Sequence, residues 1–75
     1  MFDYSKLRGK IREKFNTQEE FALAMGFSAT TLSDKLNNKV EWKQKEIDKA
    51  VELLDISKEE IPIYFFTVKV QDAEL

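Results

Sequence analysis

The side chains best suited to recognition chemistry lie in a short segment near the middle of the chain. They are short, mostly polar and helically spaced: Ala29, Thr30, Ser33 and Asp34. A helix face of this kind is flat enough to enter the major groove of DNA. Methyl groups of Ala29 and Thr30 can contact a thymine methyl, and the Thr30 and Ser33 hydroxyls can donate or accept hydrogen bonds. Asp34 can accept from cytosine N4 but repels phosphate.

No Arg or Gln stands in the middle of this segment. Those residues make the bidentate contacts with guanine or adenine, each of which adds about 1–3 kcal/mol of discrimination. Sequence selectivity would therefore come from several weak contacts, water and DNA shape. The alternative is a helical corner with a purely structural role, whose polar face is simply solvated.

Lysines that can neutralise phosphates gather at the end of this segment and beyond it: Lys35, Lys39, Lys43 and Lys45. We expect Lys39 to be the main phosphate contact, joined by backbone donors near Asn37 and Asn38. Each of these lysines can equally be an ordinary solvated side chain. Arg8 and Arg12, which lie on an earlier helix, are expected to make surface or intramolecular contacts.

Five helical segments are expected to position these side chains. Apolar spacing and end signals place them at about 4–15, 18–25, 29–36, 43–54 and a short segment from 58. Asp3 is the expected N-cap of the first, Thr17 and Glu20 form a capping box before the second, and Ser28 is the N-cap of the third. Pro62 would remove a backbone donor from the last segment, which is expected either as a single turn or to resume further on.

A tight turn joins the second and third segments. Gly26 lets the chain turn sharply, Ser28 starts the next helix two residues later, and Ala22 is small enough for a close crossing. Apolar residues on both segments are spaced to face one core: Phe21, Met25, Phe27, Leu32 and Leu36. This is the arrangement of a helix-turn-helix.

The stretch "QEEFALAMGFSATTLSDKLNNK" resembles the helix-turn-helix of the phage repressor and Cro-like family, also called the XRE family. The family's typical residues fall on Gln18, Ala22, Gly26 and Leu32. Residues 3–66 are similar to short repressor-like proteins of Gram-positive phages. The chain departs from the pattern at Lys35, where an apolar residue is usual and Leu36 is expected to replace it, and at Asn38, where Gly is common.

This resemblance implies an all-α fold: a compact bundle of about five short helices with a central helix-turn-helix, forming a lambda-repressor-like DNA-binding domain over residues 1–66. It implies sequence-specific binding to a double-stranded DNA operator by a transcriptional regulator, a phage or prophage repressor of the Cro-like type. Gln18 would contact phosphate or a base edge. The full candidate DNA-binding set is Gln18, Ser28, Ala29, Thr30, Ser33, Asp34, Lys35, Asn37, Asn38, Lys39 and Lys43.

The last part of the chain carries more apolar side chains than a core of this size is expected to absorb. From Phe66 to Val70 apolar and polar residues alternate, as in a strand. We therefore predict a homodimer contact through the fifth helix or through strand pairing, with the tail 67–75 as a candidate dimerisation strand. The candidate dimerisation residues are Ile63, Phe65, Phe66 and Val68. The alternative is that this segment caps the core of a monomer.

Composition narrows the functional class. Among 75 residues there is no Cys and no His, so the common zinc sites and Cys- or His-based nucleophilic catalysis are excluded. We expect no enzyme activity, no metal and no cofactor. No run resembles a signal peptide or reaches membrane-spanning length, so we expect no membrane contact and a cytoplasmic protein of a bacterial or phage-infected cell. The net charge of −2 hides a net of +2 over residues 1–50 and −4 over residues 51–75, which allows a basic patch on one face.

The competing function is a protein-interaction module, such as an antitoxin or anti-repressor, that uses the same fold. The acidic residues between 52 and 60 and the apolar tail favour it. Substitution Lys39→Glu distinguishes the two, because it should abolish DNA binding and leave partner binding intact.

Overall fold

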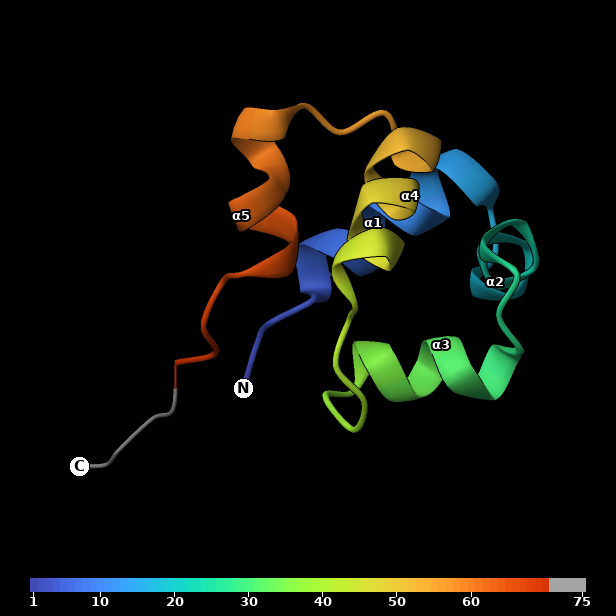
Figure 1. The fold of residues 1–75 in the computed structure, drawn as a ribbon, viewed down its shortest axis with the longest axis horizontal. Coiled ribbons are helices and arrows are strands. Elements are labelled where there is room, and N and C mark those ends of the chain that lie inside the picture. Colours follow the sequence, from blue (N-terminus) through green and yellow to red (C-terminus); the bar gives the residue numbers. More distant parts are fainter. Residues whose placement is uncertain (71–75) are drawn as a thin grey trace.

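Five α-helices account for most of the described chain (Figure 1). The structure, a computed structural model, describes residues 1–70 of the 75. The helices are α1 (Ser5–Phe15), α2 (Gln18–Met25), α3 (Ala29–Leu36), α4 (Gln44–Leu54) and α5 (Ile61–Phe65). Pairing between extended segments is limited, in this part of the chain, to one isolated bridge. The predicted all-α class with about five short helices is confirmed.

Two of the expected helix starts are confirmed, but of the capping box expected between Thr17 and Glu20 only one hydrogen bond forms, because the Thr17 N–H donates to the Phe15 carbonyl at 2.7 Å. The Thr17 hydroxyl accepts a hydrogen bond from the Glu20 N–H at 3.1 Å and begins α2, and the Ser28 hydroxyl accepts from the Thr31 N–H at 3.1 Å and begins α3. Each cap satisfies one of the N–H groups that a helix start leaves without a partner. The sequence therefore fixes where both helices of the central corner begin.

The first helix begins one residue later than predicted. The Asp3 carboxylate accepts from the Ser5 N–H at 2.9 Å, so the chain enters α1 only after Tyr4. The hydrogen bonds from the Ser5 backbone and side chain lower the pKa of Asp3, and the nearby lysines act in the same direction. Tyr4, at the N-cap position, is buried and belongs to the core.

Pro62 divides the C-terminal segment into two pieces. A 3₁₀ turn spans Lys58–Glu60, with a capping box between Ser57 and Glu60, and α5 starts anew at Ile61. Pro62 is then the second residue of α5, where its missing N–H needs no partner. The expected conflict is resolved because the proline starts a helix and does not interrupt one.

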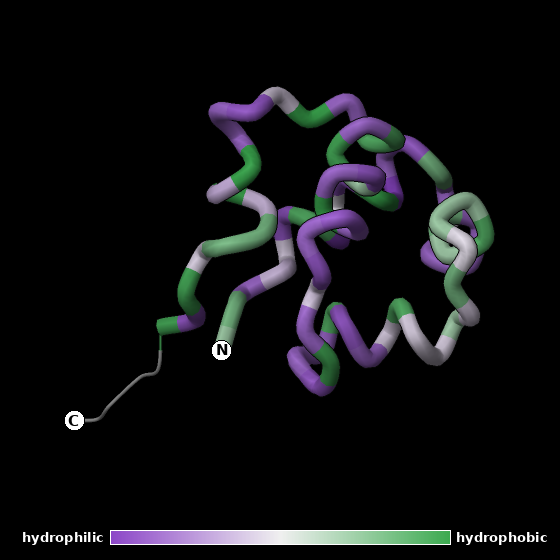
Figure 2. The backbone as a smooth tube through the Cα atoms, in the orientation of Figure 1, coloured by the Kyte–Doolittle hydropathy of each residue, from purple (hydrophilic) through white to green (hydrophobic). Residues whose placement is uncertain are grey.

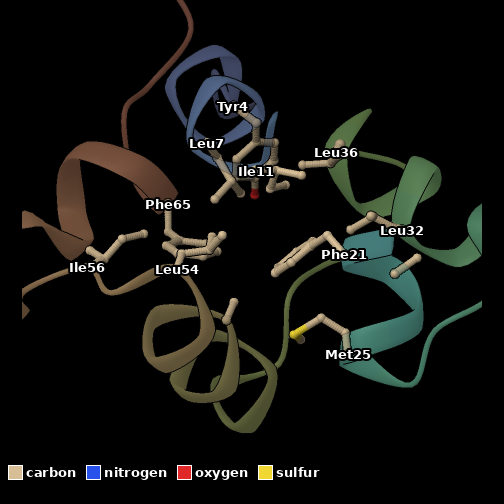
Figure 3. Packing of buried hydrophobic residues seen from close by; sticks show 12 residues of the cluster. Tyr4, Leu7, Ile11, Phe21, Met25, Leu32, Leu36, Leu54, Ile56 and Phe65 are labelled. Carbon is tan, nitrogen blue, oxygen red and sulfur yellow. The ribbon is translucent and has the colours of Figure 1, made fainter. Parts of the chain in front are cut away.

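Hydrophobic and hydrophilic residues alternate along the helices (Figure 2). One hydrophobic cluster draws on all five helices (Figure 3). Phe21 of α2 and Phe65 of α5 point toward its centre. The largest fully buried side chains are Phe21, Phe65, Leu7, Ile11, Leu32 and Leu54. Trp42, in the loop before α4, packs edge-on against Phe65 at 5.2 Å between ring centroids and is partly buried against the core.

The two ends of the described chain lie side by side as a short antiparallel ribbon. Phe2 forms the bridge with Val68; the Asp3 N–H donates to the Thr67 carbonyl at 2.7 Å, and the Lys69 N–H donates to the Met1 carbonyl at 3.0 Å. The alternating segment 66–70 thus pairs within its own chain. Residues 71–75 of the predicted tail lie outside the described residues. None of the described helices is long and apolar enough to cross a membrane.

Candidate interface on the third helix

Helices α2 and α3 meet at a tight corner that we call the α2–α3 unit (residues 17–36). Gly26 has φ +80° and ψ 22°, in the left-handed region that favours glycine. The Phe27 N–H turns back to the Ala22 carbonyl at 2.8 Å, and Ser28 then caps α3. The predicted tight corner between the two helices is therefore present, and α3 lies along the edge of the molecule (Figure 1). Its assignment as a helix-turn-helix stays a prediction.

The outward face of α3 carries the side chains proposed for recognition. Ser28, Ala29 and Thr30 are exposed, and Ser33 and Asp34 are partly exposed. A shallow hollow of about 320 Å³ opens between the start of α2 and this face, and it is lined by Gln18, Glu19, Ala29, Thr30 and Ser33. The structure brings these predicted residues together on one surface; their contact with DNA stays a prediction.

Arg8 of α1 ties this surface to the rest of the protein. Its guanidinium donates to the Asn37 side-chain oxygen at 2.9 Å, to the Leu36 carbonyl at 3.3 Å and to the Gln18 side-chain oxygen at 3.4 Å. The Asn37 amide also donates to the Ser33 hydroxyl at 3.2 Å. The expectation that Arg8 acts within the molecule is confirmed. Its role as a link among three helices was missed, because residues 28 or 29 positions apart leave no local pattern.

Lys35 is not available to DNA, which corrects its assignment as a phosphate contact. The residue is only 3% exposed, and its amino group lies 2.8 Å from a Glu46 carboxylate oxygen and donates to the Glu41 carbonyl at 3.0 Å. It also lies above the Phe27 and Trp42 rings, at 5.3 and 6.0 Å from their centroids. An apolar residue is usual at this position in the resembled family, and that signal could have identified Lys35 as an inward side chain.

The ion pair also changes the titration of its acidic member. Burial by itself would raise the pKa of Glu46. The hydrogen bonds from the Lys35 amino group and the Lys43 N–H, together with both lysine charges, outweigh burial and lower that pKa. The charge of Lys35 is therefore neutralised inside the protein and contributes little to the surface potential.

The backbone N–H groups of residues 37–40 are all bonded within the protein, which corrects the expectation that those near Asn37 and Asn38 contact phosphate. The N–H groups of Asn37, Asn38, Lys39 and Val40 all donate to carbonyls of α3. The Asn38 side chain is engaged as well: its oxygen accepts from the Phe2 N–H at 2.9 Å, and its nitrogen donates to the Phe2 carbonyl at 2.8 Å. Asn37 and Asn38 therefore hold the fold together, with Asn38 in the left-handed region at φ 64°.

Carboxylates dominate the charge of the α2–α3 unit. Within residues 17–36 the acidic residues are Glu19, Glu20 and Asp34, and the one basic residue is the buried Lys35. Lys39, Lys43 and Lys45 are exposed beyond the unit and remain candidate phosphate contacts. The face that would approach bases is thus neutral to acidic, with lysines only at one border.

The candidate dimerisation residues divide into two groups. Phe65 is 1% exposed and forms part of the core, so its assignment to an interface is wrong: the helix face it occupies turns toward Trp42 and the central cluster. Ile63, Phe66 and Val68 are exposed. They stay available to a partner.

The chain is similar in sequence and structure to a phage protein. A sequence model of the family described as "Protein of unknown function (DUF739)" matches residues 1–68. The solution structure of the modulator of repression (MOR) of the temperate bacteriophage TP901-1 from Lactococcus lactis is similar, with 56% sequence identity and a TM-score of 0.78. The match covers 93% of this chain and 95% of that chain. No curated protein sequence matches the chain.

Proposed function

We propose that this chain, which belongs to the DUF739 family, is a phage regulatory protein that modulates repression by binding a repressor protein. The similarity to a modulator of repression supports the regulatory role, and the charge of the α2–α3 unit supports a protein as the target. The competing function is the predicted one: direct binding to an operator by a Cro-like, XRE-type helix-turn-helix.

The observation that carries the proposal concerns the α2–α3 unit. It has the two-helix corner expected of a DNA-binding protein, but the charge of its surface is neutral to acidic and does not suit DNA. Affinity for duplex DNA comes largely from cations that neutralise phosphates. In the α2–α3 unit, Glu19 and Glu20 are exposed and Asp34 is partly exposed. The charge of Lys35, in contrast, is neutralised by Glu46. The surface with which a repressor binds DNA must itself be basic, so it is attracted to an acidic surface such as that of the α2–α3 unit. A protein bound to the DNA-binding surface of the repressor would interfere with repression.

Operator binding is supported by a different part of the surface. Ala29 and Thr30 are exposed at the start of α3, where a recognition helix contacts bases, and Lys39 and Lys43 stand at its far border. Together with the exposed Lys45 they make three lysines, which neutralise few phosphates, so this function requires a dimer or a second contribution to affinity.

The deciding experiment measures both targets with the same variants. We expect the purified chain to bind the repressor protein encoded by the same phage genome, measured by calorimetry. The double variant Glu19→Lys/Asp34→Lys should weaken that binding about tenfold or more, because it places like charges together. The control Glu52→Lys, an exposed acidic residue on α4, should change it little. Thermal melts establish that each variant is folded.

DNA binding is tested by selection from a random duplex library, followed by a salt titration of any enriched sequence. A palindromic site bound with a steep salt dependence, and lost on Lys39→Glu, would establish the operator function. That outcome, together with no detectable affinity for the repressor, overturns the proposal.

A further inference from the structure

The terminal ribbon (residues 1–3 and 67–70) has two outer edges. The backbone groups of one edge are hydrogen-bonded, and those of the other have no partner within residues 1–70. The bridge residues Phe2 and Val68 are flanked by the bonds from Asp3 to Thr67 and from Lys69 to Met1. In this antiparallel pattern the two bridge residues are not bonded to each other, so their own N–H and C=O groups point outward from the ribbon. The ribbon therefore presents two outer edges to its surroundings.

The outer edge at Phe2 is closed by a side chain. The Asn38 amide accepts from the Phe2 N–H and donates to the Phe2 carbonyl, at 2.9 and 2.8 Å, as a neighbouring strand would. The outer edge at Val68 has no such cover: within residues 1–70 no hydrogen bond uses its N–H or C=O, and the residue is 65% exposed. An open edge with unpaired backbone groups is a template for another strand.

Exposed apolar side chains collect at the open edge. Phe66, Val68 and Val70 alternate along it and are all exposed. A groove of about 590 Å³ adjoins the ribbon, with Met1, Phe2, Val40, Trp42 and Phe66 among its lining residues. Phe66 packs edge-on against Phe2 at 5.8 Å, so the apolar side of the ribbon continues into this groove. This end of the molecule lies away from α2 (Figure 1).

We propose that the Val68 edge pairs with the same edge of a second copy of this chain, antiparallel and about a two-fold axis at Val68. The inference does not depend on the proposed function. A two-fold contact requires a surface that complements itself. In this register Val68 faces Val68 of the second copy, and Phe66 faces Val70. Thr67 lies opposite Lys69, which keeps the two Lys69 side chains apart.

The neighbouring registers fit less well. Centring the pair on Lys69 would place two like charges directly opposite each other, which is destabilising. Centring it on Thr67 would place Val70 opposite Tyr64, which lies inside α5. Only residues with outward backbone groups can bond across the edge, and pairing about Val68 uses the Val68 N–H and C=O in both copies, with the Val70 N–H donating to the Phe66 carbonyl. The Phe66 N–H is already bonded to the Pro62 carbonyl.

The test measures the mass of the full chain by analytical ultracentrifugation from 10 to about 500 μM, a range chosen to span weak dimers. We expect a concentration-dependent dimer. Val68→Pro removes the outward N–H while the bonds from Asp3 and Lys69 remain, and it should weaken dimerisation about tenfold or more, since two intermolecular hydrogen bonds are lost per dimer. Leu23→Ser, at an apolar residue 80% exposed on α2, is the matched control and should not change the mass.

Amide hydrogen exchange supplies a second measurement that does not depend on variants. Protection of the Val68 and Val70 amides should rise with protein concentration, whereas that of Asp3 and Lys69 should stay constant. A monomer at every concentration overturns the proposal, as does a dimer whose mass and exchange are unchanged by Val68→Pro. A chain that is monomeric alone but loses repressor binding on Val68→Pro also overturns it, because the edge would then serve another partner.

Discussion

The Glu46 carboxylate lies 2.8 Å from both the Lys35 amino group and the Lys43 N–H. One side chain thus holds the last turn of α3 and the first turn of α4. The Lys35 side chain is 3% exposed and that of Glu46 is 20% exposed, so the pair is largely withdrawn from water. It orders the loop between α3 and α4, because Lys35 also donates to the Glu41 carbonyl within it.

Removing the acidic partner should destabilise the protein far more than removing both partners. Glu46→Ala leaves a buried ammonium without its counter-charge, and we expect a loss of about 3 kcal/mol in the free energy of unfolding. The double variant Lys35→Met/Glu46→Ala should recover at least about 1 kcal/mol of that loss, since Met fills the same space without charge. Urea unfolding measures both values. Strictly additive losses would show that the two residues are not coupled.

The same pair predicts an acid-sensitive stability. The pKa of Glu46 is lower in the folded chain than the ordinary glutamate value of about 4.3, so the folded state binds protons less readily than the unfolded state. Its contribution is fully present above that ordinary value and is lost as the pH falls through the folded pKa. Unfolding measured from pH 6 to pH 3 should show this loss. The slope should be smaller in Glu46→Gln; an equal slope would assign the effect to other carboxylates such as Asp3, whose pKa is also lowered.

Local signals in the sequence predict the helices well. The caps at Thr17 and Ser28 act within three residues, and Gly26 acts within one turn, so the corner could be derived from neighbours alone. The exposed set on α3 follows from the same periodicity. What could not be derived are contacts between distant residues: Arg8 with Asn37, and Asn38 with Phe2.

The wrong assignments share one physical cause. The expectations for Lys35 and Phe65 rest on residue type alone: a cation for phosphate and an apolar side chain for a partner. Lys35 instead places its amino group over two aromatic rings and beside a carboxylate on α4, and Phe65 packs against Trp42. Long side chains bury their apolar stems whenever a partner for the charge is near, and that partner is set by tertiary packing.

Two glycines with open surroundings should respond in opposite directions to the same substitution. An added methyl group meets no atom within 4 Å at either Gly9 or Gly26, so sterics with neighbours play no part. Gly26 has φ +80°, and Gly26→Ala should cost about 1–2 kcal/mol through backbone strain. Gly9 lies inside α1, and Gly9→Ala should stabilise by about 0.5–1 kcal/mol. Equal effects in thermal or urea unfolding would contradict the left-handed corner.

The clamp between Asn38 and Phe2 predicts that a single amide controls the N-terminal end of the ribbon. Asn38→Gly keeps access to the left-handed backbone at φ 64° but removes both hydrogen bonds to Phe2, and we expect a loss of about 1–2 kcal/mol. Asn16→Gly is the matched control, because Asn16 also has a positive φ of 68° and an exposed side chain; it should be neutral. In Asn38→Gly the Phe2, Asp3 and Lys69 amides should exchange faster, since the ribbon loses its anchor to the α3 corner. Unchanged exchange at Phe2 would mean that the bridge to Val68 alone holds this end.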